Sequence, residues 1–231
     1  MYSVVYEDNH LLVVVKPPNL LTQADATGDD DLLSQMKQYV KEKYQKPGDV
    51  YLGLVHRMDR PVGGLLCLAR TSKAAARLSK QVSTHEMGRE YLAITEGNLP
   101  PDGTLRHYLI KDEVQNMVSA VPEGVPGSQL AVLHFDCISR MDNTSLCHIR
   151  LETGRAHQIR VQLATAGNPL VNDARYGHGV PGRQIALWGA KLTFAHPTRG
   201  EKMTFISSPQ GETWAEYSDV IGRFLLGNPS N

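Results

Sequence analysis

Residues 56–70, which read HRMDRPVGGLLCLAR, combine charged groups with a sharp change to an apolar run. Asp59 stands between Arg57 and Arg60, just before a proline and two glycines that punctuate the backbone and permit the close approach of another segment. The apolar run that follows is typical of a buried strand. We therefore expect Asp59 beside a tight turn that leads into the core, with the two arginines keeping its carboxylate ionised and fixed in direction. Such a carboxylate suits a nucleophile; the alternative is a surface loop with an ordinary Arg–Asp pair.

Four segments of the chain resemble motifs of one enzyme family, and they occur in the family's order. The stretch 56–70 is similar to HRLDxxTSGLLLLAK, the catalytic motif of the RluA-type pseudouridine synthases. The other segments that resemble this family are REYLAITEG (89–97), GRAHQIRVQLATAGNPLVNDARYG (154–177) and ALWGAKLTFAHPTRGEKMTF (186–205). Together with an N-terminal hairpin they cover essentially the whole chain, which is identified as a member of this family.

The resemblance implies a reaction that needs no redox step, metal or cofactor. Pseudouridine formation detaches uracil from its ribose, turns the base and reattaches it through carbon, so the enzyme must extrude the base into a dry pocket beside a carboxylate. Asp59 matches the family's invariant aspartate. It would either attack the sugar, or stabilise a cationic sugar and accept a sugar proton on a glycal route. The sequence does not separate these two roles.

Tyr91 and Arg160 match two further catalytic positions of the family. The ring of Tyr91 would stack on the flipped uracil while its hydroxyl takes part in proton transfer; the alternative is a half-buried aromatic residue of a strand. Arg160 matches the arginine that pairs with the catalytic aspartate and keeps it ionised and aimed. Its alternative is an arginine on a helix surface.

Five polar residues are expected to serve RNA binding. Arg57 resembles the family's base-displacing arginine, which enters the base stack where the uridine leaves. Arg60, on the other side of the aspartate, is the second candidate on this turn. Arg155, His157 and Gln158 either buttress their own turn or contact phosphate, and His157 is expected to form hydrogen bonds rather than to act as an acid or base.

The chain departs from the family pattern at several positions. Val62 and Gly63 stand where the family has Thr-Ser, whose hydroxyls would support the loop by local hydrogen bonds. This replacement puts the rigidity of the loop in question and leaves the catalytic groups in place. Asn168 replaces the usual His, and Asn172 replaces the usual Gly at a turn, where asparagine tolerates a left-handed backbone.

The formal net charge of the chain is zero, but the basic residues are concentrated in its middle. Residues 51–200 hold 17 Lys and Arg against 12 Asp and Glu, and most of these cations are arginines, which bind phosphate through a planar fork. A local basic cleft would bind RNA with moderate, salt-dependent affinity; the alternative is chance clustering. The sequence contains no apolar stretch of 18 residues and no secretory signal. Three cysteines without C-x-x-C spacing suggest neither zinc nor a disulfide framework, so we expect a cytoplasmic monomer with free thiols.

Hydrophobic periodicity and turn signals predict the elements that must position these residues. Helices are expected with the acidic run 29–31 at the first turn, after a cap at Thr71 or Ser72, between 154 and 167, and over 214–225. Strands are expected at 4–8, 11–16, 51–55, 65–69, 91–95, 105–110, 130–138, 145–151, 185–195 and 202–206, with a loop at 121–129. This order predicts an α+β fold: a mixed, largely antiparallel twisted sheet with flanking helices. The family resemblance agrees and implies a catalytic cleft across the sheet.

We expect residues 1–231 to form one catalytic domain without the family's common S4-type module, because the hairpin begins at Val4. The expected activity is that of an RNA pseudouridine synthase acting on a uridine in a stem-loop of transfer or ribosomal RNA. One competing hypothesis is an RNA-binding protein that keeps the fold without turnover. Another is an aspartate-dependent glycoside hydrolase, which needs a second carboxylate; Glu152 is the nearest candidate.

Overall fold

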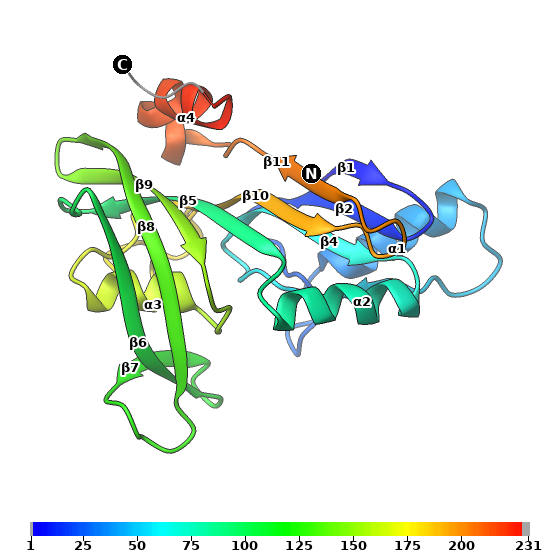
Figure 1. The fold of residues 1–231 in the computed structure, drawn as a ribbon, viewed down its shortest axis with the longest axis horizontal. Coiled ribbons are helices and arrows are strands. Elements are labelled where there is room, and N and C mark those ends of the chain that lie inside the picture. Colours follow the sequence, from blue (N-terminus) through cyan, green and yellow to red (C-terminus); the bar gives the residue numbers. More distant parts are fainter. Residues whose placement is uncertain (1, 228–231) are drawn as a thin grey trace. The chain divides into compact units, whose positions relative to one another are not determined.

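The computed structural model describes residues 2–227 and confirms an α+β fold whose strand pairings are mostly antiparallel (Figure 1). The strands are β1 Ser3–Glu7, β2 Leu11–Lys16, β3 Gly53–Leu54, β4 Gly63–Ala69, β5 Gly88–Glu96, β6 Asp102–Asp112, β7 Met117–Val121, β8 Gln129–Met141, β9 Thr144–Leu151, β10 Leu187–Ala195 and β11 Lys202–Ile206. The helices are α1 Leu32–Lys43, α2 Ser72–Ser83, α3 Gln158–Thr165, the 3-10 helix η1 Glu212–Tyr217 and α4 Ser218–Leu225. Within residues 2–227, none of the helices is long and apolar enough to cross a membrane.

The chain contacts define two compact units. Unit 1 comprises Met1–Gly88 and Gly189–Ser207, and unit 2 comprises Arg89–Trp188 and Ser208–Asn231. Unit 1 is therefore built from two separate stretches of sequence. The expectation that the whole chain acts as one catalytic domain stays a prediction.

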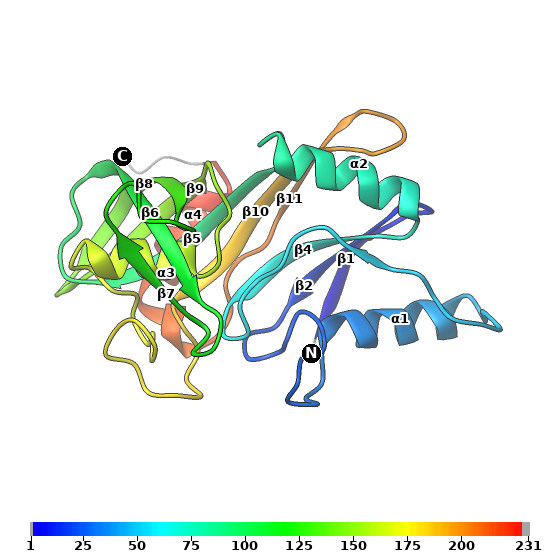
Figure 2. The same ribbon diagram turned by 90° about the horizontal axis from the view of Figure 1, so that it is seen from below.

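Unit 1 is a sheet in which β2 lies between β1 and β4, and β11 pairs with β10. Helices α1 and α2 lie on opposite sides of these strands (Figure 2). Both faces of β2 are therefore covered, which explains why its sequence is a continuous apolar run rather than an alternating one. The core on the α2 side contains Leu11, Val13, Leu65, Cys67, Ala69, Ala74, Leu78, Met87, Leu192 and Phe194.

The two helices of unit 1 each begin at a side-chain cap. The Asp31 carboxylate accepts a hydrogen bond from the Ser34 N–H at 2.9 Å, and the Thr71 hydroxyl accepts one from the Ala74 N–H at 3.1 Å. The acidic run thus ends at the cap of α1 instead of lying inside its first turn. Helix α1 ends at Lys43, a few residues before the predicted proline and glycine.

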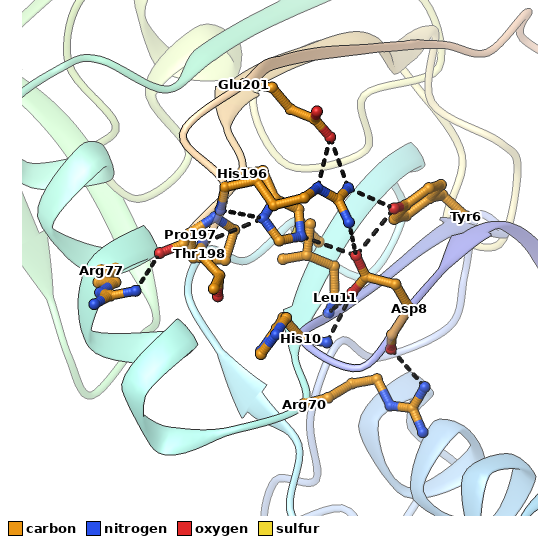
Figure 3. A network of polar contacts seen from close by, with 12 residues as sticks. Tyr6, Asp8, His10, Leu11, Arg70, Arg77, His196, Pro197, Thr198 and Glu201 are labelled. Atoms are coloured by element: carbon orange, nitrogen blue, oxygen red, sulfur yellow. Dashed lines mark hydrogen bonds and ion pairs between the residues drawn. The ribbon is translucent and has the colours of Figure 1, made fainter.

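A buried histidine ties the β1–β2 turn to the turn between β10 and β11 in unit 1 (Figure 3). The Nδ1 atom of His196 accepts hydrogen bonds from the backbone N–H groups of Thr198 and Arg199, so the proton lies on Nε2, which donates to Asp8 at 2.8 Å. Burial raises the pKa of Asp8, but hydrogen bonds from the His10 N–H, from His196 and from the Leu11 N–H outweigh this effect and lower it to about 2.

Unit 2 contains the strand order β5-β9-β8-β6-β7, with α3 packed against it. Val161 of α3 contacts Leu109 of β6, Val118 of β7 and Ala131 of β8 in one buried cluster. The left-handed backbone of Gly167, with φ +84°, follows the end of α3, as expected for a helix-terminating glycine. The helix itself is shorter than the stretch 154–167, because residues 154–157 form the turn that precedes it.

Three further elements differ from the prediction. Strand β7 was not predicted, β3 is only two residues long, and the closing helix is divided into η1 and α4 at Ser218. The other strands match the predicted ones within a few residues. The predicted loop 121–129 lies between β7 and β8, apart from its two end residues, which belong to these strands.

Candidate active site

Asp59 lies on a tight turn between β3 and β4 of unit 1, as the proline and glycines predicted. Its backbone carbonyl accepts a hydrogen bond from the Val62 N–H at 3.1 Å, which closes the turn, and its side chain is half-buried. Val62 itself is 3% exposed. The turn that follows Asp59 therefore has a buried apolar anchor where the family pattern has a hydroxyl residue.

Two side chains hold the backbone on either side of Asp59. The Thr22 hydroxyl donates to the Met58 carbonyl at 2.7 Å and accepts from the Met58 N–H at 3.3 Å. The Lys16 ammonium donates to the Arg60 carbonyl at 3.1 Å. Because these bonds reach the residues before and after Asp59, they fix the direction in which its side chain leaves the turn.

Lys16 is fully buried at the end of β2 and supports this turn with a positive charge. Its other two N–H groups donate to the carbonyls of Pro17, at 3.0 Å, and Leu20, at 2.7 Å, so three carbonyls match the three donors of an ammonium group. Burial lowers the pKa of Lys16 to about 7, while the charge of Asp59 opposes this shift. Neither Lys16 nor Thr22 was predicted as a support of this turn, and the only signal in the sequence is a lysine that ends an otherwise apolar strand.

Gly64 explains the glycine pair after Asp59. Its backbone has φ +129°, and a Cβ atom at this position would lie 2.3 Å from the backbone nitrogen of Gly189. Only glycine allows the two chain segments to approach so closely. At the start of the motif, His56 accepts a hydrogen bond from the Cys67 N–H at 3.0 Å. This bond links the segment before the Asp59 turn to strand β4.

The two arginines beside Asp59 are exposed. Arg60 forms an ion pair with Asp29 at 2.6 Å between Nη1 and Oδ2. Among residues 2–227, no hydrogen bond or ion pair engages the guanidinium of Arg57. Arg57 is therefore available to an external partner, as required of a base-displacing or phosphate-binding group.

Arg160 lies on α3 of unit 2 and is buried there, so it is not the surface arginine of the alternative. Its Nε and Nη2 atoms donate to the two carboxylate oxygens of Asp173, each at 2.8 Å. Its guanidinium carbon also lies 5.1 Å from the centre of the Tyr176 ring. Asp173 and Tyr176 were not predicted as partners of this arginine, although both belong to the block 154–177 that resembles the family.

The predicted pairing of Arg160 with Asp59 joins residues of different units and stays a prediction. The same holds for Tyr91 as a partner of Asp59 in one site. Tyr91 is confirmed as a residue of strand β5, opposite Ile149 of β9, and it is 8% exposed. Its burial leaves its role in the reaction to be tested.

The turn before α3 contains the other three predicted RNA-binding residues. Gln158 is 3% exposed: its Oε1 accepts from the Thr153 hydroxyl and the Arg155 N–H, and its Nε2 donates to the Val132 carbonyl. Of the two roles expected for Gln158, these contacts match the buttress of the turn. His157 has a left-handed backbone with φ +49°, and its Nδ1 lies 2.6 Å from the Tyr176 hydroxyl.

Arg155 is exposed beside a hollow of about 260 Å³ in unit 2. Its Nε donates to the Leu130 carbonyl at 3.0 Å, which directs the rest of the guanidinium outward. The lining of the hollow also includes Lys111, which forms an ion pair with Glu113, and the buried residues Leu109 and Val118. The hollow therefore contains an acidic group as well as basic ones, and its lining does not single out an anionic ligand.

The two asparagines that depart from the family pattern both fit their positions. Asn172 has φ +63°, the left-handed backbone that its replacement of glycine predicted, and its Nδ2 donates to the Gln184 carbonyl at 3.1 Å. Asn168 donates to the Glu96 carbonyl at 2.9 Å. Among residues 2–227 there is no cluster of three or more His, Cys, Asp or Glu side chains that could hold a metal ion.

Comparison with known proteins identifies the family. Residues 10–165 match the family described as RNA pseudouridylate synthase. The chain is 34% identical over 215 residues to the ribosomal large subunit pseudouridine synthase D of Zymomonas mobilis, with 88% of this chain and 68% of that protein covered. It is 35% identical over 205 residues to the uncharacterized RNA pseudouridine synthase YhcT of Bacillus subtilis, with 86% and 66% covered. The chain thus spans about two thirds of the length of these two relatives.

The fold gives the same answer. The solved structure of the human RNA pseudouridylate synthase domain containing 4 has a TM-score of 0.76 to this chain at 18% identity, and the match covers 95% of this chain and 92% of that one. This likeness supports the fold, while the sequence matches carry the family assignment. On these grounds the chain belongs to the RNA pseudouridine synthase family, in the RluA-type branch that its motifs resemble.

Proposed function

We propose that this enzyme isomerises specific uridines of a structured RNA and that Asp59 is the essential carboxylate. The observation that carries the proposal is the support of the Asp59 turn by two buried side chains, Lys16 and Thr22, which bind the main chain on both sides of the aspartate. A surface loop with an ordinary ion pair needs no such support. Asp59 would either attack the anomeric carbon or accept a sugar proton on the glycal route. In both cases the N1–C1′ bond breaks and a C5–C1′ bond forms. C5 then loses its proton and N1 gains one.

Tyr91 and Arg160 complete the proposed catalytic set. Tyr91 would stack on the extruded uracil and assist proton transfer, and the low exposure of its ring suits a dry pocket. Arg160 would pair with Asp59 and keep the carboxylate ionised and aimed. Its burial, together with its family match, supports this role over that of a surface cation.

Arg57, Arg60 and Arg155 are the proposed RNA contacts. All three are exposed, and the Arg155 side chain is oriented by its bond to a backbone carbonyl. Arg57 would fill the gap that the uridine leaves in the stack. Gln158 and His157 would serve binding indirectly, by shaping the turn that presents Arg155.

The proposed substrate is a stem-loop of ribosomal or transfer RNA. The names of several relatives, ribosomal large subunit pseudouridine synthase D, favour ribosomal RNA of the large subunit. Extrusion of a base costs a few kcal/mol and is cheapest in an unpaired loop, which supports a stem-loop over a long duplex. We also propose a cytoplasmic enzyme that is a monomer of 25.5 kDa, which light scattering after gel filtration would test.

The test is pseudouridine mapping of total RNA from cells with and without the gene, followed by modification of the mapped site in vitro. Asp59→Ala and Asp59→Asn should abolish pseudouridine formation while RNA affinity in filter binding stays within about twofold, because phosphate contacts supply most of the binding. Asp49→Ala, which removes an exposed carboxylate of the same unit, is the matched control and should retain full activity. Pseudouridine formation by Asp59→Ala would refute the proposed role of this residue.

The same experiment tests the substrate. An isolated stem-loop of roughly 15–20 nucleotides around the mapped uridine should be modified by the purified protein, since single-domain contacts span about that range. If only intact ribosomal subunits serve, a further contact supplies recognition and the stem-loop proposal fails. An RNA-binding protein without turnover would leave the map unchanged between the two cell lines.

A further inference from the structure

The Asp173 carboxylate holds Arg160 along one edge of its guanidinium. Asp173 binds Nε and Nη2, two N–H groups that lie on one edge of the planar guanidinium, and leaves the Nη1 side to other acceptors. The Asp173 side chain is 0% exposed and that of Arg160 is 6% exposed. A two-point contact of this kind fixes the plane of the guanidinium as well as its position.

Asp173 is itself fixed in direction. Its Oδ1 atom accepts hydrogen bonds from the N–H groups of Arg175, at 2.9 Å, and Tyr176, at 3.1 Å, in addition to the bond from Arg160. Burial raises the pKa of Asp173, but the hydrogen bond and charge of Arg160 and the two backbone donors outweigh it and leave the pKa below its ordinary value. The carboxylate is therefore ionised at neutral pH and cannot turn away from the arginine.

Tyr176 supports the same arginine from one side. Its ring centre lies 5.1 Å from the guanidinium carbon, within the range of a cation–π contact. Its hydroxyl accepts from the Val118 N–H at 2.9 Å and lies 2.6 Å from Nδ1 of His157. These bonds keep the ring in place, so residues of unit 2 support Arg160 on an edge and on a face.

Stability alone does not explain this arrangement. A buried ion pair contributes little net stability, because desolvation of both charges offsets their attraction, and an apolar pair of similar volume often serves as well. What an apolar pair cannot supply is a cation in a fixed orientation. We therefore expect Asp173 to serve the function of Arg160 and not mainly the stability of the fold.

We infer that Asp173 is a positioning residue for the isomerisation: it sets the orientation in which Arg160 meets the catalytic carboxylate, and Tyr176 supports that orientation. The inference rests on the proposed function and deepens it, since neither residue touches the reacting atoms. It predicts that the arginine is ordered before RNA binds. It also predicts that loss of Asp173 affects the chemical step more than binding.

The test compares Asp173→Asn with Ser145→Ala. The asparagine keeps the size of the side chain but removes the charge and turns an N–H donor toward the arginine. Ser145 is equally buried in unit 2 and bonds to Leu99 and Gly97 without contact to Arg160, so its variant reproduces a general loss of stability. Asp173→Asn should lower the single-turnover rate about 100-fold, the scale expected for a misplaced catalytic group, with RNA affinity within about twofold of the unaltered protein.

The pH profile separates positioning from folding. If Arg160 no longer keeps the catalytic carboxylate ionised, the rate of Asp173→Asn relative to that of the unaltered protein should be lower at pH 5 than at pH 8. The relative rate of Ser145→Ala should be the same at both pH values. A rate within threefold of the unaltered enzyme, or a pH profile parallel to it, would overturn the inference.

A second measurement needs no activity. In the ¹⁵N spectrum of arginine side chains of the unaltered protein, the Nε–H signal of Arg160, assigned with Arg160→Lys, should show slow exchange with water and restricted rotation without RNA. Fast exchange or free rotation would overturn the inference. If the signal is ordered but the unaltered enzyme makes no pseudouridine, the proposed function fails while the fixed orientation of Arg160 stands.

Discussion

The turn that carries Asp59 in unit 1 and the helix that carries Arg160 in unit 2 both present a charged group, yet these groups are held in different ways. In unit 1, Lys16 and Thr22 bind backbone atoms on either side of the aspartate. In unit 2, Asp173 binds the functional side chain itself. Substitutions beneath the first turn should therefore act on folding first, whereas those beside Arg160 should act on orientation first.

The largest effect on stability is expected at Lys16. In Lys16→Met three partly buried carbonyls lose their donor, at about 1–3 kcal/mol each, and relief from burying a charge offsets part of this, so we expect a net loss of about 4 kcal/mol in the free energy of unfolding. Urea denaturation measures it. Lys37→Met, an exposed lysine of α1, should stay within about 0.5 kcal/mol. A loss below about 1 kcal/mol for Lys16→Met would break the comparison, because the turn would then not depend on this support.

Gly64→Ala tests the backbone contact beside the same turn. The added Cβ meets the main chain of Gly189 and the residue must keep φ +129°, so we expect a loss of about 3 kcal/mol. Gly28→Ala is the matched control: it also has positive φ, +74°, but open space around it, and should cost only about 1 kcal/mol. Equal losses in thermal unfolding would show that the close approach is not tight.

The Asp8 carboxylate, whose pKa is lowered, binds His196 and lies outside the candidate catalytic set. Its pKa is about 2 in the folded protein against 3.8 unfolded, so the unfolded chain binds more protons in this range. The contribution of Asp8 to stability is then complete above pH 3.8 and is lost as the pH falls toward 2. It amounts to at most about 2 kcal/mol, since partial exposure screens it.

Unfolding free energies at pH 2 and pH 5 measure this term. Asp8→Asn should lose this part of the acid dependence, and Asp49→Asn should keep it. If Asp8→Asn and the unaltered protein lost equal stability on acidification, the network around His196 would not be the source.

The smallest effect is expected for Tyr176→Phe. The change removes the hydroxyl that bonds Val118 and His157 but keeps the ring beside Arg160, so stability should fall by about 1 kcal/mol. Its single-turnover rate should fall less than that of Asp173→Asn. Tyr51→Phe, at an exposed tyrosine, should change neither quantity. A rate loss as large as that of Asp173→Asn would shift the orienting role from the carboxylate to the hydroxyl.

Features set by local sequence could be predicted from the residues alone. The β1–β2 hairpin, the cap at Thr71, and the left-handed Asn172 all follow from local backbone preferences. Strand β7 could not be found in this way, because its few residues are followed by Pro and Gly and its place is set by pairing with β6 and by the Tyr176 hydroxyl. The division between η1 and α4 likewise has no local signal in the apolar pattern.

Residues of the candidate site could be predicted only where the sequence motifs of this chain resemble those of the family. Resemblance identified Asp59, Tyr91 and Arg160, but not the groups that hold them. Lys16 and Asp173 carry charges, which normally predict exposure, and both are buried only because segments distant in the sequence enclose them. Such burial arises from tertiary contacts that no window of sequence contains.

The contact between Gly64 and Gly189 also has a consequence for the order of events during synthesis. A ribosome that has translated as far as Trp188 has already made Asp59, Lys16 and Thr22, but not the partner that Gly64 approaches. Unit 1 is completed only when Gly189–Ser207 follows, after the long middle part of unit 2. Because contacts between distant segments form late, we expect the nascent chain to remain inactive toward RNA, including that of the ribosome that makes it, until this last stretch emerges.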